Sequence, residues 1–103
     1  MTKALVQILL PLADNHGNAF SQEAFAAIQT ELSDRFGGLT AYTRAPARGI
    51  WNKGAGRAKD DIVVIEVMVE SIDADWWKAF KARLERELRQ EEIVVRAQEI
   101  VLL

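Results

Sequence analysis

The sequence predicts a single α+β domain over residues 1–103, in which a four-stranded antiparallel sheet carries two helices on one face. Three observations predict this class. At 103 residues the chain can bury roughly two thirds of its unfolded surface around one core. Short apolar runs rich in Val, Ile and Leu are typical of strands, and two longer segments carry apolar residues at helical spacing. The absence of cysteine excludes a disulfide, a thiolate metal site and a cysteine nucleophile.

The first strand and the first helix occupy the N-terminal third of the chain. Residues 3–10, KALVQILL, form a short apolar run that ends at Pro11, which favours a strand. A helix is predicted to begin after Ser21, a good N-cap residue. It ends at Gly37 and Gly38, because glycine readily adopts the left-handed conformation that closes a helix. The inward stripe of this helix is predicted to be Phe25, Ile28 and Leu32.

Three further elements follow. Residues 39–43 are predicted to form the second strand, and 61–69 the third, since both are rich in β-branched or aromatic residues. Ser71 or Asp73 begins the second helix, and 92–103 form the last strand. The apolar stripe of that helix is Trp77, Phe80, Leu84 and Leu88, while Lys81 with Glu85 and Arg83 with Glu87 form i, i+4 pairs on its exposed side.

The element order β, α, β, β, α, β is the ferredoxin-like arrangement. With right-handed crossovers its sheet order is 4-1-3-2, and both helices pack on one face. Residues 44–59, between the second and third strands, are predicted to form a long, flexible hairpin connection with a basic tip. They carry five basic residues and no acid, so they either bind an anion or form a solvated loop. They lack the spacing of a phosphate-binding P-loop.

Alternation along the strands separates two sets of side chains. The set that faces the helices is Ala4, Val6, Ile8, Leu10, Val63, Ile65, Val67 and Val69. The opposite set is Leu5, Gln7, Leu9, Ile62, Val64, Glu66, Met68, Val94, Arg96, Gln98 and Ile100. This second face is too apolar to remain exposed in a monomer, and a second copy of the same face would cover it. We therefore expect a homodimer in which the two sheets face each other.

The expected pair of facing sheets resembles the dimeric α+β barrel superfamily across nearly the whole chain. A narrower resemblance rests on three pieces of sequence, FGGLT at 36–40, GIW at 49–51 and RQEEIVV at 89–95. These pieces are similar to those of a group of small uncharacterised bacterial and phage-associated proteins. The resemblance implies the fold and the dimer and names no activity.

Glu66 is the main candidate for chemistry, because it is an acid in the middle of a predicted strand on the covered face. Gln7 and either Arg96 or Gln98 are expected on the same face, with Thr40 and Tyr42 beside them. If the dimer encloses a cavity, Glu66 serves as general base and Tyr42 donates to a developing oxyanion. The alternative is an interface carboxylate that Arg96 or Gln98 satisfies and that only fixes strand register.

Three other residues are candidates with an ordinary structural alternative. His16 is the only histidine, and it serves either as acid or base or as a solvated turn residue. Trp51 either stacks on a ligand or anchors the hairpin. Trp76 is adjacent to Trp77 and therefore points about 100 degrees away from it on a helix. We expect Trp76 at the rim of a cavity, against a partner or at a half-covered helix edge.

The charge and the apolar runs limit the partners. The formal net charge is −2 with both signs mixed, which argues against nucleic acid. No apolar run approaches the roughly 20 residues that cross a membrane. We expect a cytoplasmic homodimer that binds a small organic molecule, with no metal or cofactor, and with acid/base or oxygenase-type chemistry if it is an enzyme. The alternative is a non-catalytic assembly or binding module whose polar residues only specify the dimer.

Overall fold

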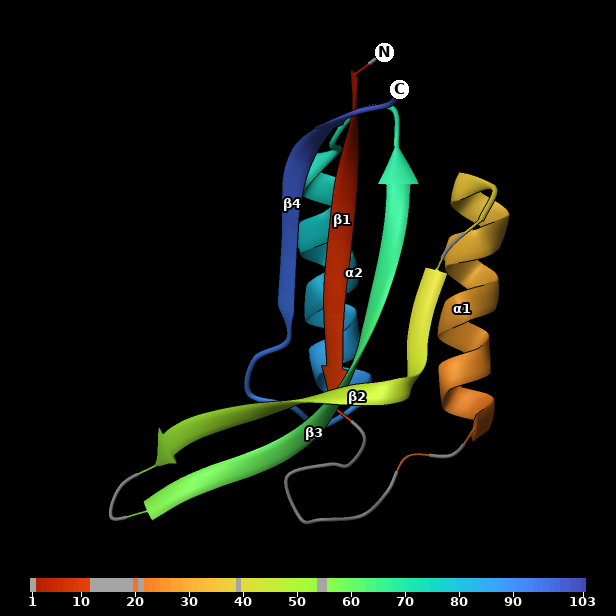
Figure 1. Cartoon of the computed structure of the whole chain (residues 1–103). Helices are drawn as coiled ribbons and strands as arrows, with labels where there is room; N and C mark the ends of the chain where they lie inside the picture. Colours follow the sequence, from red (N-terminus) through yellow and green to blue (C-terminus); the bar gives the residue numbers. More distant parts are fainter. Residues whose placement is uncertain (1, 12–19, 21, 39, 54–55) are drawn as a thin grey trace.

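A computed structural model describes residues 2–11, 20, 22–38, 40–53 and 56–103, and for 41–61 the backbone alone. The chain forms an α+β domain with two helices, which confirms the predicted class (Figure 1). The elements are β1 (Thr2–Pro11), α1 (Gln22–Phe36), β2 (Thr40–Lys53), β3 (Gly56–Val69), α2 (Ala74–Glu87) and β4 (Val94–Val101).

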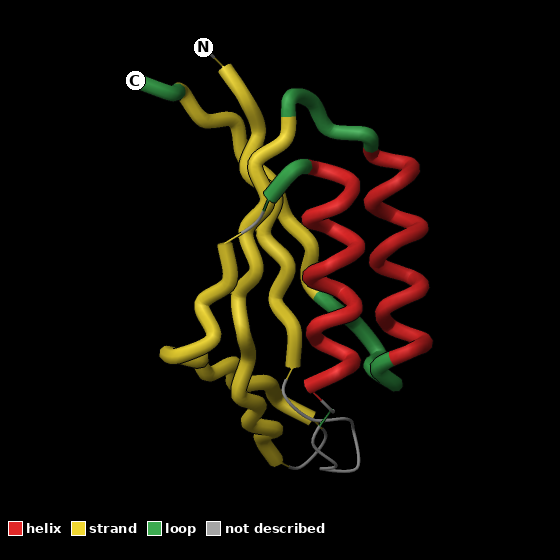
Figure 2. Tube along the Cα trace, turned by 90° about the vertical axis from the view of Figure 1, so that its right-hand side faces the viewer, coloured by secondary structure: helices red, strands yellow, loops and turns green. Residues whose placement is uncertain are grey.

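The strands form an antiparallel sheet in the order β2-β3-β1-β4. Both helices lie side by side on one face of this sheet, so the domain has two layers (Figure 2). The other face carries no element over β1 and β4, and we call it the open face. Within the described residues, neither helix is long and apolar enough to cross a membrane.

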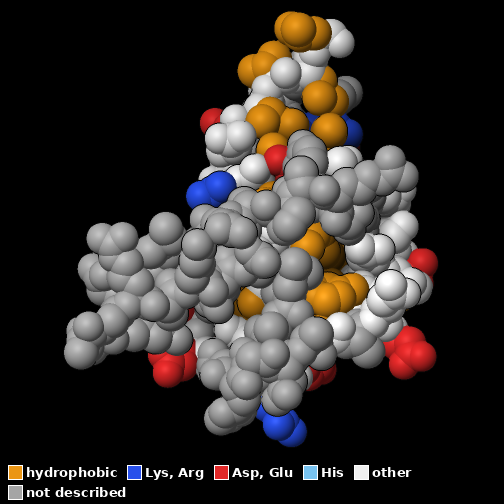
Figure 3. All heavy atoms as spheres, turned by 60° about the horizontal axis from the view of Figure 1, so that its bottom comes forward, with side chains coloured by type: hydrophobic (Ala, Val, Ile, Leu, Met, Phe, Trp, Pro, Cys, Tyr) orange, Lys and Arg blue, Asp and Glu red, His pale blue; other side chains and the backbone are white. Residues whose placement is uncertain are grey.

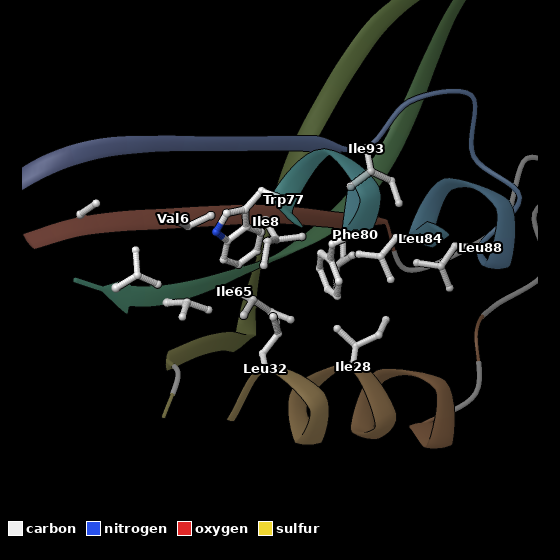
Figure 4. Close-up of a cluster of buried hydrophobic side chains, with 14 residues drawn as sticks. Val6, Ile8, Ile28, Leu32, Ile65, Trp77, Phe80, Leu84, Leu88 and Ile93 are labelled. Carbon is white, nitrogen blue, oxygen red and sulfur yellow. The ribbon is translucent and has the colours of Figure 1, made fainter. Parts of the chain in front are cut away.

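The core lies between the sheet and the helices (Figure 4). The strand residues that alternation assigned to this side are buried, and so are the apolar stripes of the two helices, apart from Phe25, which is half-buried. Burial of such side chains contributes about 25 cal/mol per Å² of apolar surface. The buried cluster is Ala4, Val6, Ile8, Leu10, Ile28, Leu32, Ile65, Val67, Val69, Trp77, Phe80, Leu84, Leu88 and Ile93.

The helix ends follow local rules. Asp73 is the N-cap of α2, and its side chain accepts a hydrogen bond from the backbone N–H of Trp76 at 3.1 Å. At the end of α1, Gly37 has a φ of 83°, and its N–H donates to the Ser33 carbonyl at 2.8 Å. The predicted left-handed cap at Gly37 is therefore confirmed. Ser21, the predicted N-cap of α1, is outside the described residues.

Glu85 fastens the last turn of α2 to the segment before β4. Its carboxylate accepts hydrogen bonds from the Lys81 ammonium at 2.7 Å and from the Ile93 N–H at 2.8 Å. The hydrogen bond from Lys81 and then that from Ile93 lower the pKa of Glu85 below its ordinary value, although partial burial opposes them. The predicted pair of Lys81 with Glu85 is confirmed, and the same carboxylate positions the chain for its entry into β4.

The prediction of a long loop over 44–59 is wrong. β2 continues to Lys53 and β3 begins at Gly56, and the two strands pair from Ala47 with Ile62 to Lys53 with Gly56. We call this paired segment the hairpin arm. Its register shifts between Tyr42 and Ala47, an interval that contains Pro46, which has no N–H to donate to a ladder. Glycines and a proline weaken the strand pattern here, but the backbone still pairs, and the arm extends away from α1 (Figure 1).

Candidate functional site

Four residues form a polar row across the middle of the open face. Strand register places Thr40 beside Glu66, Glu66 beside Gln7, and Gln7 beside Arg96. The Gln7 Nε2 donates to Glu66 Oε2 at 2.7 Å, and the Arg96 Nε donates to Gln7 Oε1 at 2.8 Å. The structure thus brings together Gln7, Glu66 and Arg96 from three strands, with Thr40 at the end of the row.

The amide of Gln7 links a negative group on one side of it to a positive group on the other. An amide offers donors at nitrogen and an acceptor at oxygen, while a carboxylate only accepts and a guanidinium only donates. The nitrogen of Gln7 therefore points to Glu66 on β3 and its oxygen to Arg96 on β4. The row carries a negative charge at Glu66 and a positive charge two strands away at Arg96, about 10 Å apart at the usual strand spacing.

Apolar side chains lie on both sides of the polar row. On one side Leu5 pairs with Met68, and on the other Leu9 pairs with Val64 and with Val94. Leu5, Leu9 and Val64 are half-buried, while Met68 is 45% and Val94 38% exposed. Hydrophobic and charged side chains are interspersed over the end of the sheet that carries the termini (Figure 3). The open face is thus a mixed surface with a hydrogen-bonded polar centre.

Ile62 departs from this pattern. Alternation assigns it to the open face, yet it is only 8% exposed. It pairs with Pro11 at the end of β1 and with Ala47 next to the register shift of β2. Beyond that shift, β2 turns across this end of the sheet (Figure 1). The open face is therefore limited on this side by the chain itself.

Of the other candidates, Thr40 belongs to the polar row, while the structure separates the rest from it or leaves them undescribed. Thr40 is exposed at the β2 end of the row. The backbone of Tyr42 pairs with Val64, one alternation step from Glu66. Trp51 pairs with Ala58 in the hairpin arm, far along β3 from the row. The side chains of Tyr42 and Trp51 are outside the described part, and so is His16.

Trp76 lies on the helical side of the sheet, not with the polar row. It is half-buried in an aromatic cluster with Phe36, Trp77 and Phe80, and the Arg35 guanidinium lies 4.4 Å from the centre of its ring. It borders an open groove of about 740 Å³ formed mainly by α1. The groove is lined by Ala27, Thr30, Glu31, Asp34, Arg35 and Trp76. The sheet therefore separates Trp76 from Glu66.

Sequence spacing missed an ion pair between the two helices. Arg83 forms an ion pair with Glu31 of α1, in addition to the predicted contact with Glu87 at 3.7 Å. A pair separated by 52 positions leaves no local pattern. Among the described residues, no group of three or more His, Cys, Asp or Glu side chains is arranged to hold a metal ion.

Comparison with known proteins gives likeness of fold only. No protein-family model matches the sequence, and no curated protein matches it. The structure is similar to a phage SAM lyase in complex with S-methyl-5′-thioadenosine, with a TM-score of 0.68 and 17% sequence identity. That alignment covers 94% of this chain and 81% of the other. A phage SAM lyase in the apo state gives a TM-score of 0.65 at 16% identity, covering 95% and 81%. At such identity the similarity shows a shared fold.

Proposed function

We propose that the open face binds S-adenosylmethionine (SAM) and that the protein is an enzyme that cleaves it, releasing S-methyl-5′-thioadenosine. The observation that carries this proposal is the hydrogen-bonded row of Arg96, Gln7 and Glu66 at the centre of the open face, with apolar side chains on both sides of it. The likeness over 94% of the chain to a SAM lyase that holds the thioadenosine supports the choice of ligand. Both charged residues of the row have a counterpart in SAM, which carries a positive sulfonium and a carboxylate.

Glu66 is the residue to which we assign the chemistry. Its negative charge favours a bound sulfonium next to it, and a carboxylate within a mostly apolar surface is suited to act as general base. Glu66 takes a proton from the carbon next to the one bonded to sulfur, and the electrons of that carbon–hydrogen bond form a carbon–carbon double bond. Both electrons of the broken carbon–sulfur bond go to sulfur, so a neutral thioether leaves together with an unsaturated amino acid. The apolar side chains around the row, Leu5 and Met68 among them, suit the uncharged parts of such a ligand.

The other members of the polar row orient Glu66 and hold the substrate. Gln7 fixes the Glu66 carboxylate through its 2.7 Å hydrogen bond. Arg96 uses its Nε toward Gln7, and a guanidinium has four further N–H donors that suit a substrate carboxylate. Thr40 and Tyr42, two residues apart on β2, are assigned to the nucleoside end of the ligand. No cofactor enters this assignment.

The homodimer with facing sheets belongs to the same proposal, as do the relation to dimeric α+β barrels and to the bacterial and phage-associated group. The exposed Met68 and Val94 support a partner over the open face. In this proposed dimer each copy is a single ferredoxin-like domain.

The deciding experiment incubates the purified protein with SAM and quantifies S-methyl-5′-thioadenosine by liquid chromatography with mass spectrometry. Glu66→Gln should reduce turnover by about 100-fold or more, the usual effect of removing a general base. The matched control is Glu99→Gln, since Glu99 is an exposed acid of β4 on the other face of the sheet. Absence of product from the unaltered protein, together with no calorimetric binding of SAM or the thioadenosine, would exclude the proposal.

A non-catalytic module is the second candidate, because Gln7 already links Glu66 to Arg96 without any ligand. In that case the row only specifies how copies associate. Turnover separates the two functions: an enzyme cleaves SAM and loses this activity in Glu66→Gln, whereas an assembly module has no turnover to lose.

A further inference from the structure

The polar row has the charge pattern of a self-complementary surface. Its two charged residues are Glu66 on β3 and Arg96 on β4, and Gln7 on the intervening strand β1 lies between them. A two-fold axis that runs parallel to β1, above Gln7, exchanges the two charged positions. Each Arg96 then lies over the Glu66 of the other copy. An axis across the strands would instead place Arg96 over Arg96 and Glu66 over Glu66, which like-charge repulsion disfavours.

Several apolar side chains match under the same operation. Leu5 and Leu9 are both on β1 and each meets its own counterpart. Val64 of β3 meets Val94 of β4, since both pair with Leu9. One rotation therefore matches Arg96 with Glu66 and three apolar positions with apolar positions. Met68 meets Gln98, since both pair with Leu5, and Lys3 of β1, which forms an ion pair with Glu70 of its own chain, meets its counterpart.

We propose that a second copy of this chain covers the open face about a two-fold axis parallel to β1, and that its Arg96 completes the site at Glu66. As far as the site is concerned, this inference rests on the proposed function. Packed sheets are about 10 Å apart, a gap that an extended arginine largely spans. The guanidinium of the second copy is thus placed to hold the carboxylate of a ligand that lies beside Glu66.

The offset of the two sheets leaves room for that ligand. The order β2-β3-β1-β4 is asymmetric about β1, with two strands on one side and one on the other. An axis above β1 places β4 of each copy over β3 of the other, and β2 has no strand opposite it. Each site is therefore open at its β2 edge, where Thr40 is exposed. Two equivalent sites result, each bounded by the β4 edge of the other copy.

The expected interface is small. A face about 30 Å long and 15–19 Å wide corresponds to roughly 1,000 Å² buried in total, at the lower limit for specific complexes. The dimer should therefore dissociate on dilution, and its mass is best followed by light scattering over a wide concentration range.

Arg96→Glu should raise the dissociation constant of this dimer by about tenfold or more, because it places like charges together. Lys78→Glu, the same charge change on the exposed side of α2, should leave it unchanged.

A complementation experiment tests the pairing itself. Glu66→Arg should weaken self-association like Arg96→Glu, while the double variant with both changes and an equimolar mixture of the two single variants should both dimerise. Circular dichroism melting curves establish that each variant is folded. If Arg96→Glu associates as tightly as the unaltered protein, or the double variant stays monomeric while folded, the pairing is excluded.

Cross-linking tests the position of the two-fold axis. Because the chain contains no cysteine, a thiol reagent reacts only at the cysteine that each variant introduces. With a short bis-maleimide, Leu9→Cys should cross-link to itself, and Val64→Cys should cross-link to Val94→Cys in a mixture. Lys78→Cys on α2 is the control that should stay uncrosslinked. A dimer that gives no Leu9→Cys product contradicts this geometry. SAM cleavage by a strict monomer would overturn this inference and the proposed dimer while leaving the SAM-cleaving activity intact. A cross-linked dimer without SAM binding would keep the two-fold axis and exclude the activity.

Discussion

The two faces of the sheet differ in how fully the rest of the chain buries their side chains. On the helical side of β1, Ala4, Val6, Ile8 and Leu10 are at most 5% exposed and belong to one buried cluster with residues of both helices. On the open side of the same strand, Leu5 and Leu9 are half-buried on either side of Gln7, which is hydrogen-bonded to two charged groups. One face is complete within a single chain. The other combines apolar surface with an organised polar centre, which is the composition of a surface that binds something.

The largest expected effect comes from truncating two adjacent residues of β1, Ile8 on the helical face and Leu9 on the open face. Ile8→Ala should lower the free energy of unfolding by about 2–5 kcal/mol, because Ile8 is 0% exposed and its deletion leaves a cavity in the core. Leu9→Ala should cost less than about 1.5 kcal/mol in dilute protein, since Leu9 is half-buried and its site can relax into solvent. Urea unfolding of both variants at the same low concentration measures the difference. Equal losses would mean that the open face is as much a part of the core as the helical face.

The sequence was sufficient for the α+β class and for the sorting of side chains in the middle of β1 and β3. Period-2 alternation is unambiguous there, because every second residue of β1 and of 63–69 is apolar. The same alternation brought Gln7 and Glu66 to one face. It could not determine that the amide of Gln7 bridges two charges, which depends on register between strands far apart in sequence.

The hairpin arm and the helix contacts required three-dimensional information. In 44–59 the alternation is interrupted by Pro46 and three glycines, so local rules favoured a loop, while the ladder from Ala47 with Ile62 onward keeps the backbone paired. Trp76 was ambiguous because adjacent helix positions diverge, and only packing against Phe36 and Phe80 decides its side of the molecule. Ile62 shows the limit of alternation beside a bulge.

An intermediate effect is expected at the cap of α1, which helps to hold the helical layer. Gly37 has a φ of 83°, and a Cβ built on it would meet no atom within 4 Å, so any cost of substitution is conformational. Gly37→Ala should lower stability by about 1–2 kcal/mol. Gly37→Asn should cost less, because asparagine tolerates the left-handed region. Thermal unfolding of the two variants tests this order, and equal stability of Ala and Gly at this position would contradict it.

The smallest and most pH-dependent effect is expected at Glu85, on the helical side. Because the Lys81 and Ile93 hydrogen bonds lower the pKa of Glu85 in the folded protein, the ionised carboxylate stabilises the fold above the pKa of the unfolded chain. This contribution is lost as the pH falls through the lower, folded pKa. Glu85→Gln should therefore be less stable than the unaltered protein at pH 7, and the difference should shrink in acid.

Urea unfolding at several pH values between 7 and the acid limit of the fold measures this effect, with Glu87→Gln as the control. Glu87 is an exposed acid whose contact with Arg83 is 3.7 Å long, and exposed pairs of this kind contribute little. A pH-independent deficit in Glu85→Gln would assign the stabilisation to packing or to the Ile93 N–H alone. A deficit that disappears in acid would show that charge fastens α2 to the start of β4, the strand that carries Arg96 to the open face.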